Sequence, residues 1–146
     1  MVVYADTSFL FSLYANDANS VRAREEGLRL TSRASMAFTA LQRHELHNAL
    51  CLSVFREELA IRQSRAIQTL IAEDIQAGVL VEVQTDWAKA YTYAETLSEA
   101  YTSTIGCRAS DILHVALAQM LGIECFYSFD VRQRCLAKKM GLDVKP

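Results

Sequence analysis

The feature of this chain that most constrains its fold is the alternation of short apolar segments with longer helical patterns. Apolar segments at Val2–Ala5, Ala34–Thr39, Val79–Val83 and Cys125–Ser128 have the length of strands, and most lack the polar alternation of a half-exposed strand. Such strands are typical of a parallel sheet covered by helices on both faces. We therefore predict an α/β fold, a three-layer α/β/α sandwich around a mostly parallel sheet of about four to five strands.

Helical patterns fill the intervals between these strands. The first predicted helix follows Val2–Ala5 and is capped by Thr7 or Ser8. Thr102–Cys107 is predicted as a loop, and Leu142–Val144 is a candidate edge strand. The remaining predicted helices cover Val21–Leu30, Leu41–Phe55, Glu57–Ala77, a segment begun by Thr85 or Asp86 and running to about Tyr101, a segment capped by Ser110 and running to Leu121, and a last helix opened by Asp130.

Length and composition suit one domain over residues 1–146. The 146 residues are 51% hydrophobic, Pro146 is the only proline, and no linker interrupts the pattern. The formal charge of −2 argues against a protein that coats nucleic acid, but not against a nuclease, because divalent cations bring their own positive charge. The N-terminus lacks a basic region, and no apolar run approaches the roughly 20 residues of a membrane span, so we expect a cytoplasmic protein without a membrane anchor.

Two acids follow predicted strands directly. Asp6 comes after the first strand, and Asp130 comes after the strand Cys125–Ser128. Ligands of open parallel sheets bind beyond the carboxyl ends of the strands, so both side chains are candidate metal ligands. Taken alone, each is more readily explained as a helix N-cap, since Asp is a preferred capping residue.

Two further acids lie on predicted helices. Glu45 shares an apolar stripe with Leu41 and Ala49, where a lone carboxylate is costly to bury, so it either faces a cleft, pairs with a cation or lies at an edge open to water. Asp111 begins a helix that is apolar nearly all round, where the helix dipole also favours an acid. His114, three residues later, is a candidate partner of Asp111 or a satisfied half-buried histidine.

Taken together, these acids predict a shared divalent-cation site. Clustered carboxylates repel one another unless a cation lies between them. Oxygen ligands without His or Cys at ligand spacing favour Mg²⁺ or Mn²⁺ over zinc. Such a site suits hydrolysis of a phosphodiester, because a divalent cation activates water and offsets charge on the phosphate. In this hypothesis Asp6, Asp111 and Asp130 hold one or two ions, and Glu45 completes the ligand set directly or through water.

Four stretches of the chain resemble the motifs of PIN-domain ribonucleases, most closely the toxin branch called VapC. The resemblance covers essentially the whole chain in the family's order and spacing. The matching stretches are Val3–Leu10 (VYADTSFL), His44–Leu46 (HEL), Ala109–Ala118 (ASDILHVALA) and Phe126–Asp130 (FYSFD).

The resemblance implies an endoribonuclease that depends on Mg²⁺ or Mn²⁺, cuts single-stranded RNA and leaves a 5′-phosphate. It assigns the metal ligands to Asp6, Glu45, Asp111 and Asp130, makes Ser8 the hydroxyl that orients a water, and matches Ser128 to the family's Ser or Thr before the last acid. It also implies a homodimer and, for a toxin, a small antitoxin protein that blocks the cleft.

Two other functions remain as alternatives. A PIN-like fold can serve as a non-catalytic interaction module, although all four acids are present here. A small-molecule phosphohydrolase of the haloacid-dehalogenase type needs a second Asp two residues after its nucleophile, and position 8 is Ser.

Overall fold

The structure is a computed structural model that describes residues 1–31 and 34–146. Within these ranges the strands form one parallel sheet in the order β3-β2-β1-β4-β5. The strands are β1 (Val2–Ala5), β2 (Ser35–Phe38), β3 (Leu80–Glu82), β4 (Cys125–Tyr127) and β5 (Asp143–Lys145). The parallel sheet confirms the prediction from the apolar strands, and β5 confirms the candidate edge strand with a shift of one residue.

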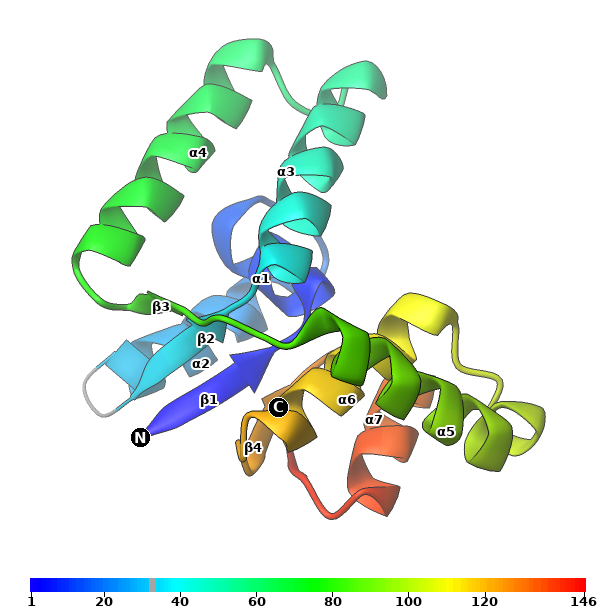
Figure 1. The fold of residues 1–146 in the computed structure, drawn as a ribbon. Coiled ribbons are helices and arrows are strands. Elements are labelled where there is room, and N and C mark those ends of the chain that lie inside the picture. The colour runs from blue at the N-terminus through cyan, green and yellow to red at the C-terminus, as the bar shows by residue number, and fades with distance from the viewer. Residues whose placement is uncertain (32–33) are drawn as a thin grey trace.

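Helices cover both faces of this sheet, as predicted for an α/β/α sandwich (Figure 1). Alternate residues of β1 point to opposite faces. The helices are α1 (Thr7–Tyr14), α2 (Ser20–Thr31), α3 (Ala40–Phe55), α4 (Ile61–Gln76), α5 (Trp87–Ile105), α6 (Ala109–Met120) and α7 (Val131–Lys139). Tyr4 packs in a cluster with α5, α6 and α7, whereas Val3 and Ala5 pack in a cluster with α1 and α2.

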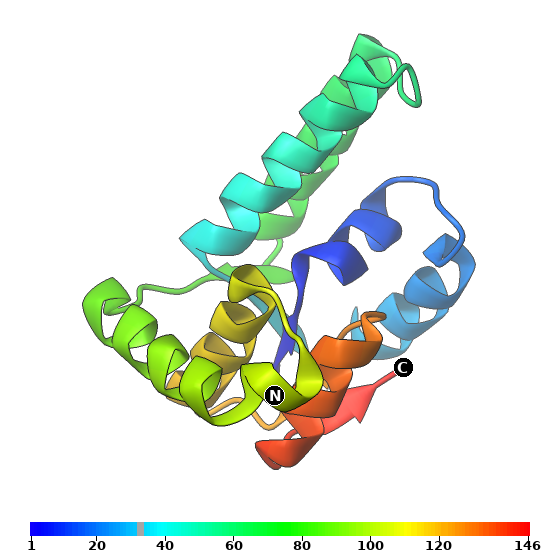
Figure 2. The ribbon, with the colours of Figure 1, turned by 90° about the vertical axis from the view of Figure 1, so that its right-hand side faces the viewer.

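The helices α3 and α4 form a hairpin that projects away from the sheet (Figures 1 and 2). Glu57, in the corner between them, has a φ of 61°, a left-handed conformation that ends α3 and that no helix can continue through. α4 therefore begins at Ile61 and not at Glu57 as the sequence pattern predicted.

Of the N-cap candidates that the sequence offered for α1, Asp6 takes the role, and Thr7 and Ser8 lie in the first turn. Two other predicted boundaries were wrong for local reasons. α5 continues through part of the predicted loop to Ile105 and ends at Gly106, which has a φ of 74° and supplies the left-handed C-cap. α6 begins at Ala109, so that Ser110 lies inside the helix and does not cap it.

The connections that follow β1 and β4 leave room for a binding crevice at the carboxyl ends of these strands. The chain leaves β1 through α1 and α2 to reach β2 on one side, while β4 pairs with the other side of β1. The connections after neighbouring parallel strands diverge at such a point and leave a crevice beyond the strands' carboxyl ends. Asp6 follows β1 and Asp130 comes three residues after β4, so both lie at this edge.

Candidate active site

The predicted metal ligands line a single cleft at the carboxyl edge of the sheet. Asp6, Glu45, Asp111 and Asp130 all contribute to its wall, and the cleft has a volume of about 330 Å³. They come from the end of β1, from α3, from the first turn of α6 and from the N-cap of α7. The fold thus brings together acids that are far apart in the sequence.

Asp6 is the most buried of these acids, with 4% of its surface exposed. Its Oδ1 accepts a hydrogen bond of 2.7 Å from the backbone N–H of Phe9, which caps α1. Burial raises the pKa of Asp6 above its ordinary value, and His114 and hydrogen bonds from Phe9, Ser8 and Ser128 offset only part of this increase. The capping role expected from the sequence is present, and it holds the carboxyl group at the cleft.

Two serine hydroxyls converge on Asp6. Ser8 Oγ and Ser128 Oγ donate to Asp6 Oδ2 at 2.8 and 2.9 Å. Ser128 Oγ also accepts from the backbone N–H of Asp130 at 3.0 Å, so this buried residue links Asp6 to Asp130. Asp130 in turn caps α7 by accepting from the backbone N–H of Gln133 at 2.7 Å.

Glu45 is placed in the cleft by the start of α3. Gln42, in the first turn of this helix, is fully buried, and its Nε2 donates to the carbonyl oxygens of Ala5 at 2.6 Å and Ala37 at 3.1 Å. These bonds fix α3 to the ends of β1 and β2. Glu45, one turn later, is therefore held close to Asp6 by the backbone of the sheet itself.

The Glu45 carboxylate is fixed by two side chains from other helices. Its Oε2 accepts from Thr7 Oγ1 at 2.6 Å and lies 2.8 Å from His114 Nε2. Burial is the largest single influence on the pKa of Glu45 and opposes ionisation. Hydrogen bonds and charge from His114, together with Thr7 and His44, outweigh it and lower this pKa. Glu45 is therefore ionised, and one of its oxygens is committed to these two partners.

His114 also reaches into the core. Its Nδ1 lies 2.9 Å from the hydroxyl of Tyr4, whose pKa is raised by burial, so this hydroxyl keeps its proton. Because a carboxylate only accepts, Nε2 carries a proton toward Glu45, and Nδ1 is the ring atom paired with the Tyr4 hydroxyl. The sequence offered Asp111 as the partner of His114; within the described residues the carboxylate that His114 contacts is Glu45.

Asp111 is held by the residue that precedes α6. Its Oδ2 accepts from Arg108 Nε at 3.1 Å and from the Arg108 backbone N–H at 3.3 Å. The Arg108 side chain is 77% exposed, and Asp111 raises the pKa of its guanidinium. Arg108 thus places a positive charge at the cleft rim, beside an acid on the wall.

The oxygen chemistry of this cleft fits a divalent cation. Among the described residues, Glu45 Oε1, Asp111 Oδ1 and Asp130 Oδ2 receive no hydrogen bond, so each of these acids has an oxygen free for a ligand. Hard oxygen donors of this kind suit Mg²⁺ or Mn²⁺. In the present side-chain positions, residues 1–31 and 34–146 contain no group of three or more acid, His or Cys side chains close enough to hold one ion. The acids share a cleft, and each is held by its own donors.

Sequence reasoning missed part of the cleft wall. Thr7, Asn48 and Ser110 line it beside the acids, and Thr7 bonds directly to Glu45. The position of Thr7 immediately after Asp6 was the available signal, because the first residues of a helix after a parallel strand point into the same crevice. Asn48 lies nearly one helical turn after Glu45 on the same face of α3.

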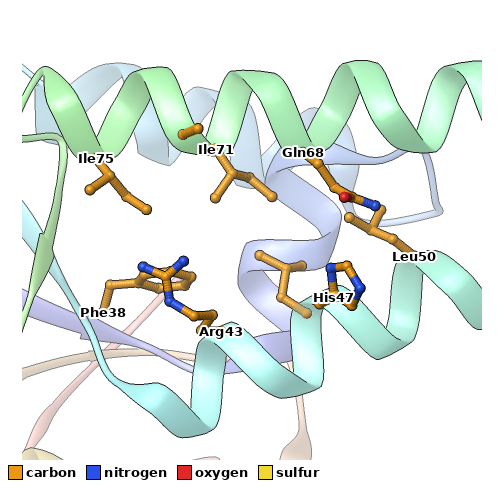
Figure 3. Close-up of a pocket in the computed structure, with 9 residues that line it drawn as sticks. Phe38, Arg43, His47, Leu50, Gln68, Ile71 and Ile75 are labelled. Atoms are coloured by element: carbon orange, nitrogen blue, oxygen red, sulfur yellow. The ribbon is translucent and has the colours of Figure 1, made fainter.

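A separate hollow between α3 and α4 lacks comparable chemistry. Figure 3 shows Phe38, Leu50, Ile71 and Ile75 around it, with the guanidinium of Arg43 5.3 Å from the centre of the Phe38 ring. Among the described residues that line this hollow, none carries a carboxylate. The acid-lined cleft is therefore the candidate active site.

Known structures share this architecture. A sarcin–ricin-loop-cleaving toxin, VapC20 of Mycobacterium tuberculosis, is 18% identical with a TM-score of 0.63, and the match covers 100% of both chains. FitAcB of Neisseria gonorrhoeae is 15% identical with a TM-score of 0.61, covering 100% of this chain and 97% of that chain. VapBC2 of Rickettsia felis, bound to a DNA fragment from its promoter, is 14% identical with a TM-score of 0.68, covering 99% and 98%. At these identities the likeness shows the fold.

The family is shown by the sequence itself. No curated protein matches the chain. The sequence model of the PIN domain family, however, matches residues 3–139, a range that includes all four acids of the cleft. The chain therefore belongs to the PIN domain family.

Proposed function

We propose that this protein is an endoribonuclease that depends on Mg²⁺ or Mn²⁺ and hydrolyses phosphodiester bonds of RNA. The observation that carries the proposal is that Asp6, Glu45, Asp111 and Asp130 line one cleft at the carboxyl edge of a PIN-family sheet. Such a concentration of acids in one cleft is costly without a cation, and a cation bridges the acids to a phosphate.

The four acids share one task in this proposal. Asp6, Glu45, Asp111 and Asp130 would hold the ion, which when bound promotes ionisation of water and offsets charge on the phosphate. Ser8 and Ser128 hold Oδ2 of Asp6 in place at the cleft, and Thr7 and His114 hold Oε2 of Glu45.

Two further groups act on the substrate side. The Arg108 guanidinium at the rim attracts a phosphate that approaches the acids. Ser8 is exposed, so its hydroxyl can turn from Asp6 toward a water, which is the role that the family resemblance assigns to it.

We further propose that the protein is the toxin of a toxin–antitoxin pair, of the VapC type. The structures that share its fold include the VapC20 toxin and the VapBC2 complex, which supports an antitoxin partner for this chain. A single PIN-like domain over residues 1–146, acting in the cytoplasm, suits this role. Within the described residues, every helix is too short or too polar to span a bilayer. The pairing is tested by looking for an adjacent open reading frame that encodes a small DNA-binding protein. Expression of that protein should relieve the growth arrest that the toxin causes.

The projecting α3–α4 hairpin supports a homodimer. Large apolar side chains lie exposed on it, with Phe55 at 82%, Ile61 at 58% and Leu70 at 50%. An interface between two copies of the hairpin would cover these side chains. Light scattering of the purified protein tests this state, and Phe55→Ser together with Leu70→Ser is expected to yield monomers.

The nuclease activity is tested with purified protein and transfer, ribosomal and messenger RNA in Mg²⁺ or Mn²⁺. We expect the wild type to cut at least one of these RNAs and EDTA to stop it. Asp6→Asn and Asp111→Asn should abolish cleavage, while Asp143→Asn, an exposed acid on β5, should leave it unchanged. Equal cleavage by all four proteins would refute the proposal, and absence of cleavage by the wild type in every RNA would favour a non-catalytic interaction module.

A further inference from the structure

The candidate cleft continues beyond the acids into a second hollow of about 670 Å³. The two spaces share Thr7, Ser8, Ala49, Arg108 and Asp130 as wall residues, so they form one continuous groove. The hollow contains a polar and aromatic wall that the acid site does not use. Its additional wall residues include Phe11, Asp17, Arg56 and Phe129.

One wall of the groove is a stripe formed by α3 and its C-cap residue, Arg56. Glu45, Ala49, Leu52 and Arg56 follow one another at spacings of four, three and four residues, which places them on one helical face. With a rise of 1.5 Å per residue, the backbone of Arg56 lies about 16 Å along the helix from that of Glu45. Adjacent phosphates of a stacked strand are about 3.4 Å apart along its axis, so Arg56 reaches a different phosphate from the one at the acids.

The guanidinium of Arg56 is available for a ligand. Arg56 is exposed, and its side chain makes no hydrogen bond or ion pair with the described residues, in contrast to Arg108, which bonds to Asp111. The acid at this end of the groove, Asp17, already accepts hydrogen bonds from Ser12 at 2.7 Å and from the backbone of Asn19 at 2.8 Å. The far end of the groove therefore offers an unpaired positive charge.

An aromatic ring also lines this hollow. Phe129 is half-buried, and its ring stacks on Phe9 with a centroid distance of 5.4 Å and an angle of 22°. The same residue lines the second hollow. A ring that is fixed from behind and open to a groove is a platform on which a base can stack, at low cost in side-chain entropy.

We propose that this groove binds the RNA strand on one side of the scissile phosphate, with Arg56 holding a backbone phosphate several nucleotides away and Phe129 stacking a base between. This inference rests on the proposed ribonuclease function and adds where the strand runs. Alternating cationic and aromatic contacts along a groove suit a single strand, whose phosphates and bases are both accessible. A substrate too short to reach Arg56 loses this contact.

The test measures the binding of fluorescein-labelled single-stranded RNA by anisotropy, in the Asp6→Asn background with Mg²⁺, where cleavage does not interfere. The probes are a trinucleotide and a mixed-sequence 12-mer. Arg56→Ala should weaken binding of the 12-mer about fivefold, leave the trinucleotide unchanged, and reduce the slope of log affinity against log salt by about 0.7. Arg56→Lys should retain the salt slope. Phe129→Leu should weaken binding of the 12-mer, although leucine still packs an apolar side chain against Phe9.

The matched control is Arg62→Ala, which removes an exposed arginine from α4, outside the groove. If Arg56→Ala binds the 12-mer with the same affinity and salt slope as Arg62→Ala, the inference is overturned. If the wild type cuts RNA but Arg56→Ala leaves binding of the 12-mer unchanged, this inference alone is overturned. Failure of the wild type to cut RNA, together with failure of the Asp6→Asn protein to bind it, would overturn the proposed function as well.

Discussion

His114 Nε2 lies 2.8 Å from Glu45 Oε2, joining two helices whose contacting residues are 69 positions apart in the sequence. The other nitrogen of the same ring lies 2.9 Å from the hydroxyl of Tyr4 on the central strand. His114 and Tyr4 are buried, so this chain of hydrogen bonds runs from the core to the wall of the cleft. The position of Glu45 is therefore determined by the packing of the core.

Replacing His114 with Ala should affect both the fold and the cleft. The change leaves the buried Tyr4 hydroxyl without this partner and creates a cavity, for which we expect a loss of about 2–4 kcal/mol in the free energy of unfolding. Glu45 also loses a donor, so Mn²⁺ should bind more weakly even at temperatures where the variant is fully folded. Urea unfolding and calorimetric Mn²⁺ titration measure the two effects.

The control for this prediction is His47→Ala. His47 is exposed on α3 and lines the other hollow, so its removal should change stability by less than about 0.5 kcal/mol and leave Mn²⁺ affinity unchanged. A His114→Ala variant as stable as His47→Ala would contradict the role of the buried chain.

Asp6→Asn should stabilise the protein in EDTA at neutral pH. Burial raises the pKa of Asp6 in the folded state, so the folded protein binds this proton more tightly than the unfolded chain does. The stability from this group is present at acid pH and is lost as the pH rises from the unfolded pKa through the folded pKa. Asn keeps the cap on α1 without the buried charge.

Thermal melts of both proteins in EDTA measure this effect. At pH 7 we expect the Asn variant to melt higher by about 2–4 °C, the shift of roughly 1 kcal/mol for a domain of this size. The difference should shrink as the pH falls, because the raised pKa lets the wild-type carboxyl regain its proton in the folded state. A lower melting temperature for Asp6→Asn than for the wild type at pH 7 would contradict the prediction that the ionised Asp6 carboxylate destabilises the folded state.

Ser128 and Ser8 bond to the same oxygen of Asp6 but should differ in their contribution to stability. Ser128 is buried and also accepts from the backbone of Asp130, so Ser128→Ala should cost about 1–2 kcal/mol. Ser8 is exposed, and Ser8→Ala should cost less than about 0.5 kcal/mol because water replaces the hydroxyl. Chemical denaturation of the two variants under one condition compares them, and equal losses would contradict the link through Ser128.

Much of the fold could be predicted because its signals are local. Apolar runs without alternation specify buried parallel strands, and capping at Asp86 and Asp130 follows from their side chains. Local signals failed where two candidates lay side by side. Asp6 caps α1, for which Thr7 and Ser8 were also candidates, and α5 continues to Ile105 before Gly106 because nothing in Thr102–Ile105 breaks a helix.

The candidate site could be predicted only in part. Acids that follow parallel strands necessarily meet at one edge, so the common position of Asp6 and Asp130 is a consequence of topology. The pairing of His114 with Glu45 depends on how α3 and α6 pack across the end of β1, and no sequence spacing encodes that packing. For the same reason the sequence did not reveal the second half of the groove at Arg56 and Phe129.

We propose that acids from distant parts of the chain form one divalent-cation site, and calorimetric titration of the purified protein with Mn²⁺ measures this binding directly. We predict saturable binding to the wild type and to Asp143→Asn, and binding weakened about tenfold or more in Asp6→Asn, Asp111→Asn and Asp130→Asn. Absence of binding to the wild type, or equal binding to all five proteins, would contradict the claim.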